Sequence, residues 1–441
     1  MVIGGDAGGM TSATGARKLD GDLDIVALEK SSWVSYSACG IPYLVAGDAD
    51  RLEDLVARTP QEFRDRHKID VRLRHEAMAV DTDAGQVEVR DHEHGRTVRI
   101  PYDQLVIATG ARPRRPEIPG INGETVLGVQ TLADAQRLLE RADRTKPRDV
   151  VVVGGGYIGL EMAESFVRRG AKVRVVEGAP EIMGTLDPDM AALVRAAMVR
   201  TGIEVRCGAP VSAFEPGAVH LEGGETVPAD LVVLGLGVDP NTELAGNAGV
   251  ELGVKGAIRV NSRQQASVDG VWAAGDCCES YHLVSRRPVH IALGTVANRQ
   301  ARVAGINLGG GYATFPGVVG TAVTKLCSTE VARTGLNERE AAEAGLEYVV
   351  GKIEATTRAS YFPGAKAIWV KLLAERRSGR VLGVQIVGEE GAGKRIDAVA
   401  VAITAEMTVE DLISADLSYA PPFSPLWDPV QVAARKASGL L

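Results

Sequence analysis

Short apolar runs recur along the first three quarters of the chain, and segments with a helical spacing of apolar residues separate them. Continuous runs of this length, bounded by glycine turns, are typical of strands buried on both faces of a parallel sheet. The strands are expected at residues 24–28, 105–110, 150–153, 172–176 and 271–276, and helices at 10–19 and 160–169. The alternation of strands and helices predicts an α/β fold.

From about residue 318 the pattern changes to α+β. Strands are expected at 318–326, 346–355, 368–374 and 380–387, and an apolar-faced helix at 396–407. Asn337 and Glu340 form a capping-box pattern that predicts the start of a helix ending at Gly345. Thr408 and Asp411 predict a second, short helix. The chain therefore ends in a domain of a different class.

A glycine cluster lies at the start of the chain, where only Met1, Val2 and Ile3 precede it, so we expect a shortened first strand. The cluster is an imperfect G-x-G-x-x-G motif, because Asp6 takes the place of the second glycine. Glu29 follows Gly9 after twenty residues, a spacing at which an acid can bind the ribose of a dinucleotide. An ordinary glycine-rich turn is the alternative. The candidate residues are Gly4, Gly5, Ala7, Gly8, Gly9, Glu29 and Lys30.

A second glycine cluster has glycine at all three required positions. It follows an apolar strand, opens a helix, and is followed by a second strand that ends in Glu177. Strand, fingerprint, helix, strand and acid together indicate a dinucleotide site. Glu177 would accept hydrogen bonds from a ribose 2′-hydroxyl and repel a 2′-phosphate, which favours NADH over NADPH. The candidate residues are Gly154, Gly156, Tyr157, Ile158, Gly159 and Glu177.

Two further apolar strands end in residues suited to a cofactor. One ends in Thr109-Gly110 and the other in Gly275-Asp276. Asp276 can accept a hydrogen bond from a ribityl hydroxyl, and Gly275 lets the backbone approach a pyrophosphate. Plain strand-to-helix turns would have the same composition.

Cys39 lies between Ser35 and Pro42 in a segment that is expected to form a turn, and the next cysteine along the chain is Cys207. A lone redox cysteine has to react through a mixed disulfide, a persulfide or a sulfenic acid. A buried core cysteine is the alternative. The remaining cysteines and histidines lack the spacing of metal ligands, so we expect no metal site; they are Cys207, Cys277, Cys278, Cys327, His92 and His94.

The composition of the chain argues against several classes of protein. The net charge of −8 gives no support for nucleic-acid binding. No apolar run approaches the roughly 18 to 20 residues that span a bilayer, and no signal peptide is evident. Five cysteines are too few and too scattered for a disulfide scaffold. We therefore expect a cytoplasmic protein with neither nucleic-acid nor membrane partners.

In these motifs and their order, the chain resembles the flavin-dependent pyridine nucleotide–disulfide oxidoreductases. The single cysteine resembles the branch that holds coenzyme A-disulfide reductases, NADH oxidases, NADH peroxidases and persulfide reductases. The resemblance implies two interleaved Rossmann-like domains, with FAD at 1–112 and 240–320 and NAD(H) at 113–239. It also implies a C-terminal dimerisation domain at 321–441. Electrons would pass from NADH to flavin, then to Cys39, then to the substrate.

The same resemblance assigns further residues. Ala7 replaces the histidine that peroxidases and many oxidases have at this position, which argues against peroxide reduction. Tyr361 and Tyr419 match tyrosines that coenzyme A-disulfide reductases supply to the cysteine across the dimer interface. Packing at an interface is the alternative for both. The expected substrate-binding residues are Thr11, Arg17, Lys18, Ser35 and Asn298, although Asn298 stands where some relatives have His.

The sequence thus predicts an FAD-dependent, NADH-driven reductase of a small disulfide or persulfide, working as a homodimer with shared active sites. Coenzyme A disulfide and coenzyme A persulfide are the leading substrates, and coenzyme A is the candidate ligand at Cys39. Two alternatives remain open. One is an NADH oxidase that reduces O₂, and the other is a non-catalytic NADH-binding redox sensor.

Overall fold

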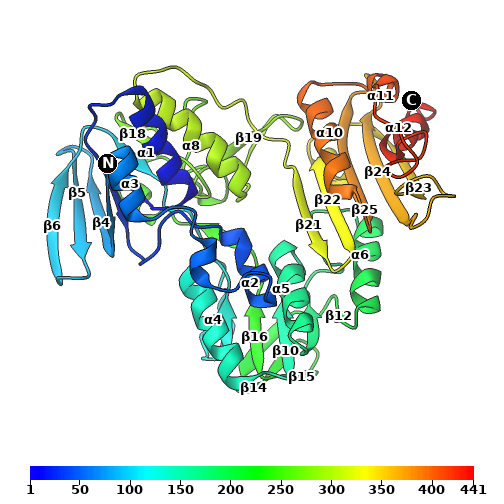
Figure 1. Cartoon of the computed structure of the whole chain (residues 1–441), viewed down its shortest axis with the longest axis horizontal. Coiled ribbons are helices and arrows are strands. Elements are labelled where there is room, and N and C mark those ends of the chain that lie inside the picture. The colour runs from blue at the N-terminus through cyan, green and yellow to red at the C-terminus, as the bar shows by residue number, and fades with distance from the viewer.

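The computed structural model describes all residues from Met1 to Leu441. Two parts of the molecule are built on five-stranded parallel sheets, and the C-terminal part is built on a five-stranded antiparallel sheet (Figure 1). This agrees with the predicted α/β fold that ends in an α+β domain. None of the helices has both the length and the apolar character that crossing a membrane requires.

The first parallel sheet has the strand order β18-β7-β1-β2-β3 and draws on two distant parts of the chain. Helix α1 (Ala7–Leu19) packs side by side with α8 (Gly294–Leu308), and Gly15 and Gly305 permit the close approach. A small antiparallel sheet, β4-β5-β6, packs against this unit, because Val87 and Val89 share a core with Ile107. The remaining bounds are β1 Val2–Ile3, β2 Ile25–Glu29, α3 Pro60–His67, β3 Ile69–Leu73, β4 His75–Asp81, β5 Gln86–Asp91, β6 Arg96–Pro101, β7 Leu105–Ile107 and β18 Val271–Ala273.

The second parallel sheet has the order β12-β11-β10-β16-β9 and is also accompanied by a three-stranded antiparallel sheet, β13-β14-β15. Two short strands, β8 (Ala111–Pro113) and β17 (Val238–Pro240), pair antiparallel where the chain enters and leaves this unit. The bounds are β9 Val126–Gly128, α4 Leu132–Thr145, β10 Asp149–Val153, α5 Tyr157–Arg168, β11 Lys172–Val176, α6 Pro188–Arg200, β12 Glu204–Arg206, β13 Val211–Glu215, β14 Gly217–Leu221, β15 Thr226–Ala229 and β16 Leu231–Leu234.

A short helix of the first unit, α2 (Ile41–Ala46), is buried in the core of the second. Its Ile41, Leu44 and Val45 belong to the same hydrophobic cluster as Leu160 and Phe166 of α5. The smaller elements of the first unit are the 3-10 turns η1 (Ala38–Gly40), η2 (Leu52–Leu55) and η3 (Val254–Gly256), with α7 (Glu243–Asn247), β19 (Ser280–His282) and β20 (Arg287–Val289).

The C-terminal sheet has the order β21-β22-β25-β24-β23 and is antiparallel throughout. Helix α10 contacts β22 and β25, and α12 contacts β23 and β24. The bounds are β21 Ala322–Leu326, β22 Thr329–Gly335, α9 Glu338–Glu343, β23 Tyr348–Thr356, β24 Ala367–Glu375, β25 Val381–Gly388, α10 Ala392–Thr404, α11 Val409–Ser414 and α12 Pro429–Ser438.

The two predicted capping boxes are confirmed, because the Asn337 and Thr408 side chains accept hydrogen bonds from the backbone N–H of Glu340 and Asp411. Other expectations for this domain were inaccurate. The strand expected at 318–326 begins only at Ala322, the helix expected at 396–407 runs from Ala392 to Thr404, and strand β22 was not foreseen.

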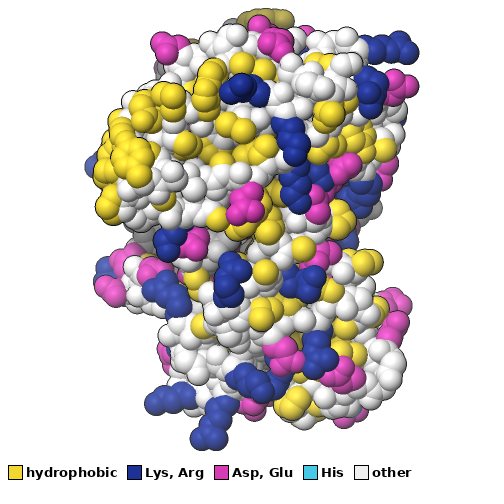
Figure 2. All heavy atoms as spheres, turned by 90° about the vertical axis from the view of Figure 1, so that its right-hand side faces the viewer, with side chains coloured by type: hydrophobic (Ala, Val, Ile, Leu, Met, Phe, Trp, Pro, Cys, Tyr) yellow, Lys and Arg dark blue, Asp and Glu magenta, His cyan; other side chains and the backbone are white.

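The C-terminal domain exposes several large aromatic and apolar side chains. Hydrophobic side chains gather at the upper left of the face seen in Figure 2. The exposed aromatic residues of this domain are Tyr361, Tyr419, Phe423 and Trp427. Such a surface is typical of an interface with another chain.

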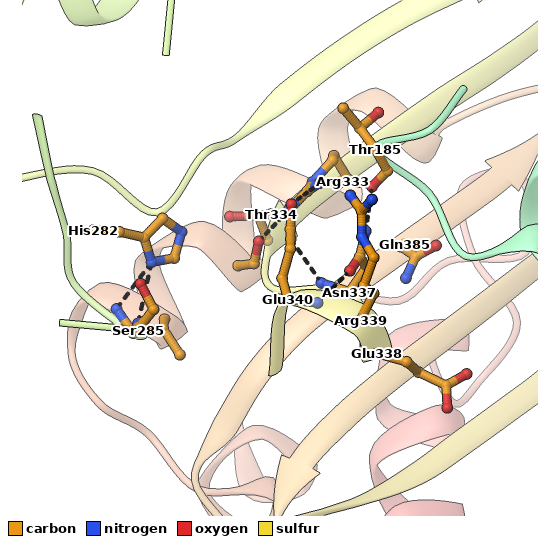
Figure 3. A network of polar contacts seen from close by, with 12 residues as sticks. Thr185, His282, Ser285, Arg333, Thr334, Asn337, Glu338, Arg339, Glu340 and Gln385 are labelled. Atoms are coloured by element: carbon orange, nitrogen blue, oxygen red, sulfur yellow. Dashed lines mark hydrogen bonds and ion pairs between the residues drawn. The ribbon is translucent and has the colours of Figure 1, made fainter. Parts of the chain in front are cut away.

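His282 joins the first unit to the C-terminal domain and is almost fully buried. Its Nδ1 atom accepts hydrogen bonds of 3.3 Å from the N–H groups of Val284 and Ser285 (Figure 3). Burial is the main reason that its pKa falls from the ordinary 6.5 to about 4, and the charges of Glu340 and Arg333 act in opposite directions.

We expect acid to destabilise the protein partly through His282. Between pH 6.5 and 4 the unfolded chain binds a proton at this residue and the folded chain does not, so this contribution is present above pH 6.5 and is lost as the pH falls. At about 1.4 kcal/mol per pKa unit, the loss is about 2 kcal/mol by pH 5 and about 3 kcal/mol by pH 4. Chemical denaturation of His282→Gln at pH 7 and pH 5 should show a smaller loss than wild type. The exposed His92→Gln is the control, and an unchanged pH dependence in His282→Gln would contradict the assignment.

Candidate active site

The two glycine clusters form the same turn. Gly4 and Gly154 have φ angles of +114° and +105°, which only glycine adopts readily. A Cβ on Gly9 would lie 1.9 Å from the Gly4 carbonyl oxygen, and one on Gly159 would lie 2.0 Å from that of Gly154. The absence of a second glycine at Asp6 therefore does not change the path of the first turn. Both turns direct the N-terminus of a helix at the position suited to a pyrophosphate.

An acidic side chain braces each turn in the same way. The Glu29 carboxylate accepts hydrogen bonds from the N–H groups of Gly5 (2.9 Å) and Ser31 (2.7 Å). The Glu177 carboxylate accepts them from Gly155 and Ala179, both at 2.8 Å. A carboxylate offers about four acceptor positions, so each acid can still receive ribose hydroxyls. Lys30, the neighbour predicted beside Glu29, is exposed.

The two other candidate strand ends lie side by side. Strands β7 and β18 pair in parallel, so Thr109-Gly110 and Gly275-Asp276 meet at one edge of the first sheet. The Gly275 N–H donates to Gln300 Oε1 at 3.0 Å. A Cβ on Gly8 would lie 2.8 Å from the Ala274 carbonyl oxygen, so the first glycine turn approaches the same edge. The structure thus brings the first cluster, Thr109, Gly110, Gly275 and Asp276 together.

Cys39 lies in η1, and the segment before it is attached to the first glycine turn. The N–H of Ser35 donates to the Gly5 carbonyl at 2.8 Å, and the N–H of Tyr36 donates to Asp6 Oδ1 at 3.1 Å. The segment after it is α2, which is buried in the second unit. Cys39 is therefore held between the two dinucleotide-type turns, and Cys39 itself is exposed to solvent.

The surroundings of the thiol are acidic. Partial desolvation, followed by the carboxylates of Glu161, Asp276 and Asp6, raises the pKa of Cys39. Burial raises the pKa of Asp6 to about 6, with smaller contributions from Glu29 and Asp276. In the single chain, neighbouring side chains thus favour the protonated thiol.

Glu161 is a candidate that sequence reasoning missed. It lies on α5, two residues after Gly159, and its Oε1 accepts a 2.7 Å hydrogen bond from Thr324 Oγ1 of the C-terminal domain. Desolvation raises its pKa, and its charge acts on Cys39. The sequence did contain one signal for this residue: Glu161 lies one helical turn after Tyr157, on the same face of the helix.

The expected substrate residues are only partly brought together. Thr11 Oγ1 donates to Asn298 Oδ1 at 2.9 Å, which joins α1 to α8, and Lys18 is exposed. Ser35 lies in the segment that leads to Cys39 and has a φ of +48°.

Arg17 is engaged elsewhere, which corrects its assignment as a phosphate ligand. Its guanidinium donates to four backbone carbonyls, those of His67 (2.9 Å), Gly21 (2.5 Å), Leu23 and Lys68 (3.1 Å). An arginine has five N–H donors, so these contacts leave little capacity for a ligand. The residue ties α1 to the loops around α3, and Lys18 is the remaining basic candidate.

Tyr361 and Tyr419 lie in the loops before β24 and after α11, and both are exposed. Desolvation and then the neighbouring Tyr419 hydroxyl raise the pKa of Tyr361, so the two phenols lie close to each other. Helices α11 and α12 are at the opposite side of the molecule from α1 and α8 (Figure 1).

Comparisons with known proteins agree with this geometry. Residues 1–301 match the model of the pyridine nucleotide-disulphide oxidoreductase family, and residues 321–429 match the dimerisation domain of that family. The chain belongs to the pyridine nucleotide-disulphide oxidoreductases.

Three similar proteins narrow the comparison. The NAD(P)H sulfur oxidoreductase (CoA-dependent) of Pyrococcus furiosus is 39% identical over 99% of this chain and 98% of its own length. The NADH oxidase of Methanocaldococcus jannaschii is 36% identical over 99% and 98%. The structure of an NAD-dependent persulfide reductase from A. fulgidus has a TM-score of 0.97 and 37% identity, and the match covers 100% of this chain and 83% of that one.

Replacing Glu177 by Ala should weaken the use of NADH and narrow its advantage over NADPH. The change removes the carboxylate at the end of β11. In wild type, the N–H groups of Gly155 and Ala179 hold this carboxylate in place. One lost hydrogen bond to a charged group corresponds to about 1.5–3 kcal/mol, so we expect a KM for NADH roughly 10- to 100-fold higher. Steady-state kinetics with both nucleotides measure this, and the exposed Glu222→Ala is the control. A wild-type preference for NADPH would overturn this interpretation of Glu177.

Proposed function

We propose that this protein is an FAD-dependent, NADH-driven reductase of a low-molecular-weight disulfide or persulfide, with coenzyme A derivatives as the leading substrates. The observation that carries the proposal is the position of Cys39, an exposed thiol held between two dinucleotide-type turns. The other four cysteines are partly or fully buried. The similarity to the NAD(P)H sulfur oxidoreductase of Pyrococcus furiosus and the persulfide reductase from A. fulgidus supports sulfur and persulfide as the substrate class.

The residues of the first unit fit FAD. Gly4 and Gly9 let the first turn and α1 pack closely on neighbouring backbone, which places the N-terminus of α1 where a pyrophosphate would bind. Glu29 would bind the adenosine ribose, and Asp276 would bind the ribityl chain. The second unit would hold NADH through Gly154, Gly159 and Glu177. When bound, FAD supplies two-electron transfer between NADH and a sulfur centre. We place the FAD domain at residues 1–112 and 240–320, the NAD(H) domain at 113–239, and the C-terminal domain at 321–441.

Cys39 carries the exchange with the substrate. Its thiolate attacks one sulfur of the substrate disulfide, the S–S bond breaks, and one thiolate leaves while a mixed disulfide forms at Cys39. Two electrons then cleave the mixed disulfide and release the second thiolate. The net reaction converts NADH, a proton and one disulfide into NAD⁺ and two thiols. With a persulfide, the products are a thiol and hydrogen sulfide.

The active site would be shared between two copies of the chain. Tyr361 and Tyr419 belong to the domain that matches the family's dimerisation domain, and their phenols are exposed in the single chain. From the partner subunit they would donate protons to the leaving thiolate. Thr11, Asn298, Ser35 and Lys18 would bind the rest of the substrate, with Lys18 near its phosphates.

A second candidate, NADH oxidation by O₂, is favoured by the similarity to the Methanocaldococcus protein. Anaerobic NADH consumption separates the two functions. A disulfide or persulfide reductase consumes NADH without O₂ only when the sulfur substrate is added. If NADH consumption requires O₂ and ignores every disulfide and persulfide, the oxidase is correct.

Cys39→Ser should abolish disulfide or persulfide reduction and leave flavin reduction by NADH intact, because the thiol acts after the flavin. Anaerobic stopped-flow absorbance follows the first half-reaction, and product thiol measures the second. Cys207→Ser is the matched control, since this partly buried thiol lies on the second unit. Normal disulfide and persulfide turnover in Cys39→Ser would refute the mechanism.

Tyr419→Phe and Tyr361→Phe should slow substrate turnover by about 10²- to 10⁴-fold, the usual loss when a proton donor is removed. The change retains the ring, so dimer formation and flavin reduction should stay normal. Tyr281→Phe, at an exposed tyrosine of β19, is the control. Wild-type rates in both variants would make these tyrosines packing residues of the interface.

A further inference from the structure

The segment between β11 and α6 closes over the second glycine turn. The Met183 N–H donates to the Gly155 carbonyl at 2.8 Å. A Cβ added to Gly155 would lie 2.5 Å from Ile182 Cγ2, so the segment lies directly on the turn. Thr185 Oγ1 lies 3.4 Å from the Tyr157 hydroxyl. Residues 182–187 are therefore packed and hydrogen-bonded directly against the turn.

The far end of this segment is held by the C-terminal domain (Figure 3). The Thr185 carbonyl accepts hydrogen bonds from Arg333 Nη1 (2.6 Å) and Asn337 Nδ2 (3.2 Å). Gln385 Oε1 accepts from the Asp187 N–H, and Gln385 Nε2 donates to Asp187 Oδ2, both at 2.7 Å.

Charged groups complete the contact. Lys371 Nζ lies 3.0 Å from Asp187 Oδ2 and 2.8 Å from Asp189 Oδ1, and it also pairs with Glu338. These three carboxylates are close enough together to resemble a metal site, but the Lys371 ammonium pairs with all three, and Lys352 pairs with Asp189 as well. Arg333 pairs with Glu340 at 2.8 Å. The contact is thus a complementary polar surface.

The polar side chains of this contact are buried, which makes their pairing specific. The four residues that make these contacts are each no more than 7% exposed: Arg333, Lys371, Gln385 and Asp187. Buried polar groups are costly unless their hydrogen bonds are complete. Apolar residues could join two domains without needing complete hydrogen bonds. Here the side chain of Gln385 forms hydrogen bonds with Asp187 and with no other residue. One arrangement of the segment satisfies all of these groups.

We propose that Gln385 and Arg333 are positioning residues for NADH, acting through residues 182–187. The C-terminal domain holds this segment, and through it the glycine turn, in the arrangement that binds the dinucleotide. The domain then has a role in the nucleotide site of its own chain besides forming the dimer. This inference rests on the proposed function, because it takes NADH to be the ligand of the second unit.

Gln385→Met tests the proposal, because methionine keeps the length of the side chain and loses both hydrogen bonds to Asp187. The FAD-loaded dimer is mixed with NADH under anaerobic conditions, and stopped-flow absorbance gives the Kd for NADH and the limiting rate of flavin reduction. We expect the Kd to rise about tenfold, because NADH binding must then also restore the arrangement of a segment that has lost two hydrogen bonds. The limiting rate and the rate with saturating NADH and disulfide should stay within about twofold of wild type.

Lys325→Met is the matched control. It removes another contact between the C-terminal domain and the second unit, the 3.2 Å pair with Glu164 on α5, which does not touch residues 182–187. We expect its Kd for NADH to equal that of wild type. If Gln385→Met does not fold, Arg333→Lys replaces it, because this variant keeps the charge beside Glu340 and loses the planar fork that reaches the Thr185 carbonyl.

The outcomes are distinct. An unchanged Kd in a folded, dimeric Gln385→Met or Arg333→Lys overturns the inference and leaves the proposed function intact. An equal rise in Lys325→Met also overturns it, since any loosening of the domains would then suffice. A wild-type protein that binds neither NADH nor NADPH overturns the proposed function, and the inference with it.

Discussion

The arrangement of the candidate site depends on the burial of α2 in the core of the second unit. Ile41, Leu44 and Val45 are each no more than 3% exposed, and they pack among apolar residues of α5. Burying one such side chain contributes about 1.5–3 kcal/mol, so the three together are a substantial part of a typical domain's stability. Arg168 and Asp48 add a two-pronged ion pair at the end of the same helix. Because Cys39 directly precedes α2, this packing fixes the thiol between the two units.

Backbone geometry, more than side-chain identity, makes the two dinucleotide-type turns equivalent. In each turn, the first glycine adopts a positive φ. Because the last glycine has no side chain, the helix can pack directly against the carbonyl oxygen of the first glycine. The middle position differs, with Asp6 in one turn and Gly156 in the other. Asp6 uses its side chain to hold the Tyr36 N–H, which attaches the cysteine segment to the first turn. The departure from the motif therefore has a structural reason in the placement of Cys39.

Local patterns predicted the parts of the fold in which the local signal and the tertiary environment agree. Continuous apolar runs gave the strands at 150–153 and 172–176, and two side-chain caps gave the starts of α9 and α11. Strand β22 and the two small antiparallel sheets were missed, because their mixed polarity resembles loops until the facing core is known. Arg17 was misjudged for a similar reason: the carbonyls that it binds belong to residues up to 51 positions away. Glu161 escaped notice because its significance depends on its hydrogen bond with Thr324 and on the effect of its charge on Cys39, both of which only folding creates.

The electrostatics of Cys39 connect the dimer to the chemistry. Desolvation and the carboxylates of Glu161, Asp276 and Asp6 all raise the pKa of the thiol, whereas only a backbone hydrogen bond lowers it. Attack on a disulfide needs the thiolate, and the departing thiolate needs a donor. In one chain the paired phenols of Tyr361 and Tyr419 are exposed on the C-terminal domain. Phenols brought by a partner subunit would supply hydrogen-bond donors without adding negative charge to an acidic site. In the proposed chemistry, these donors would therefore come from a second copy of the chain.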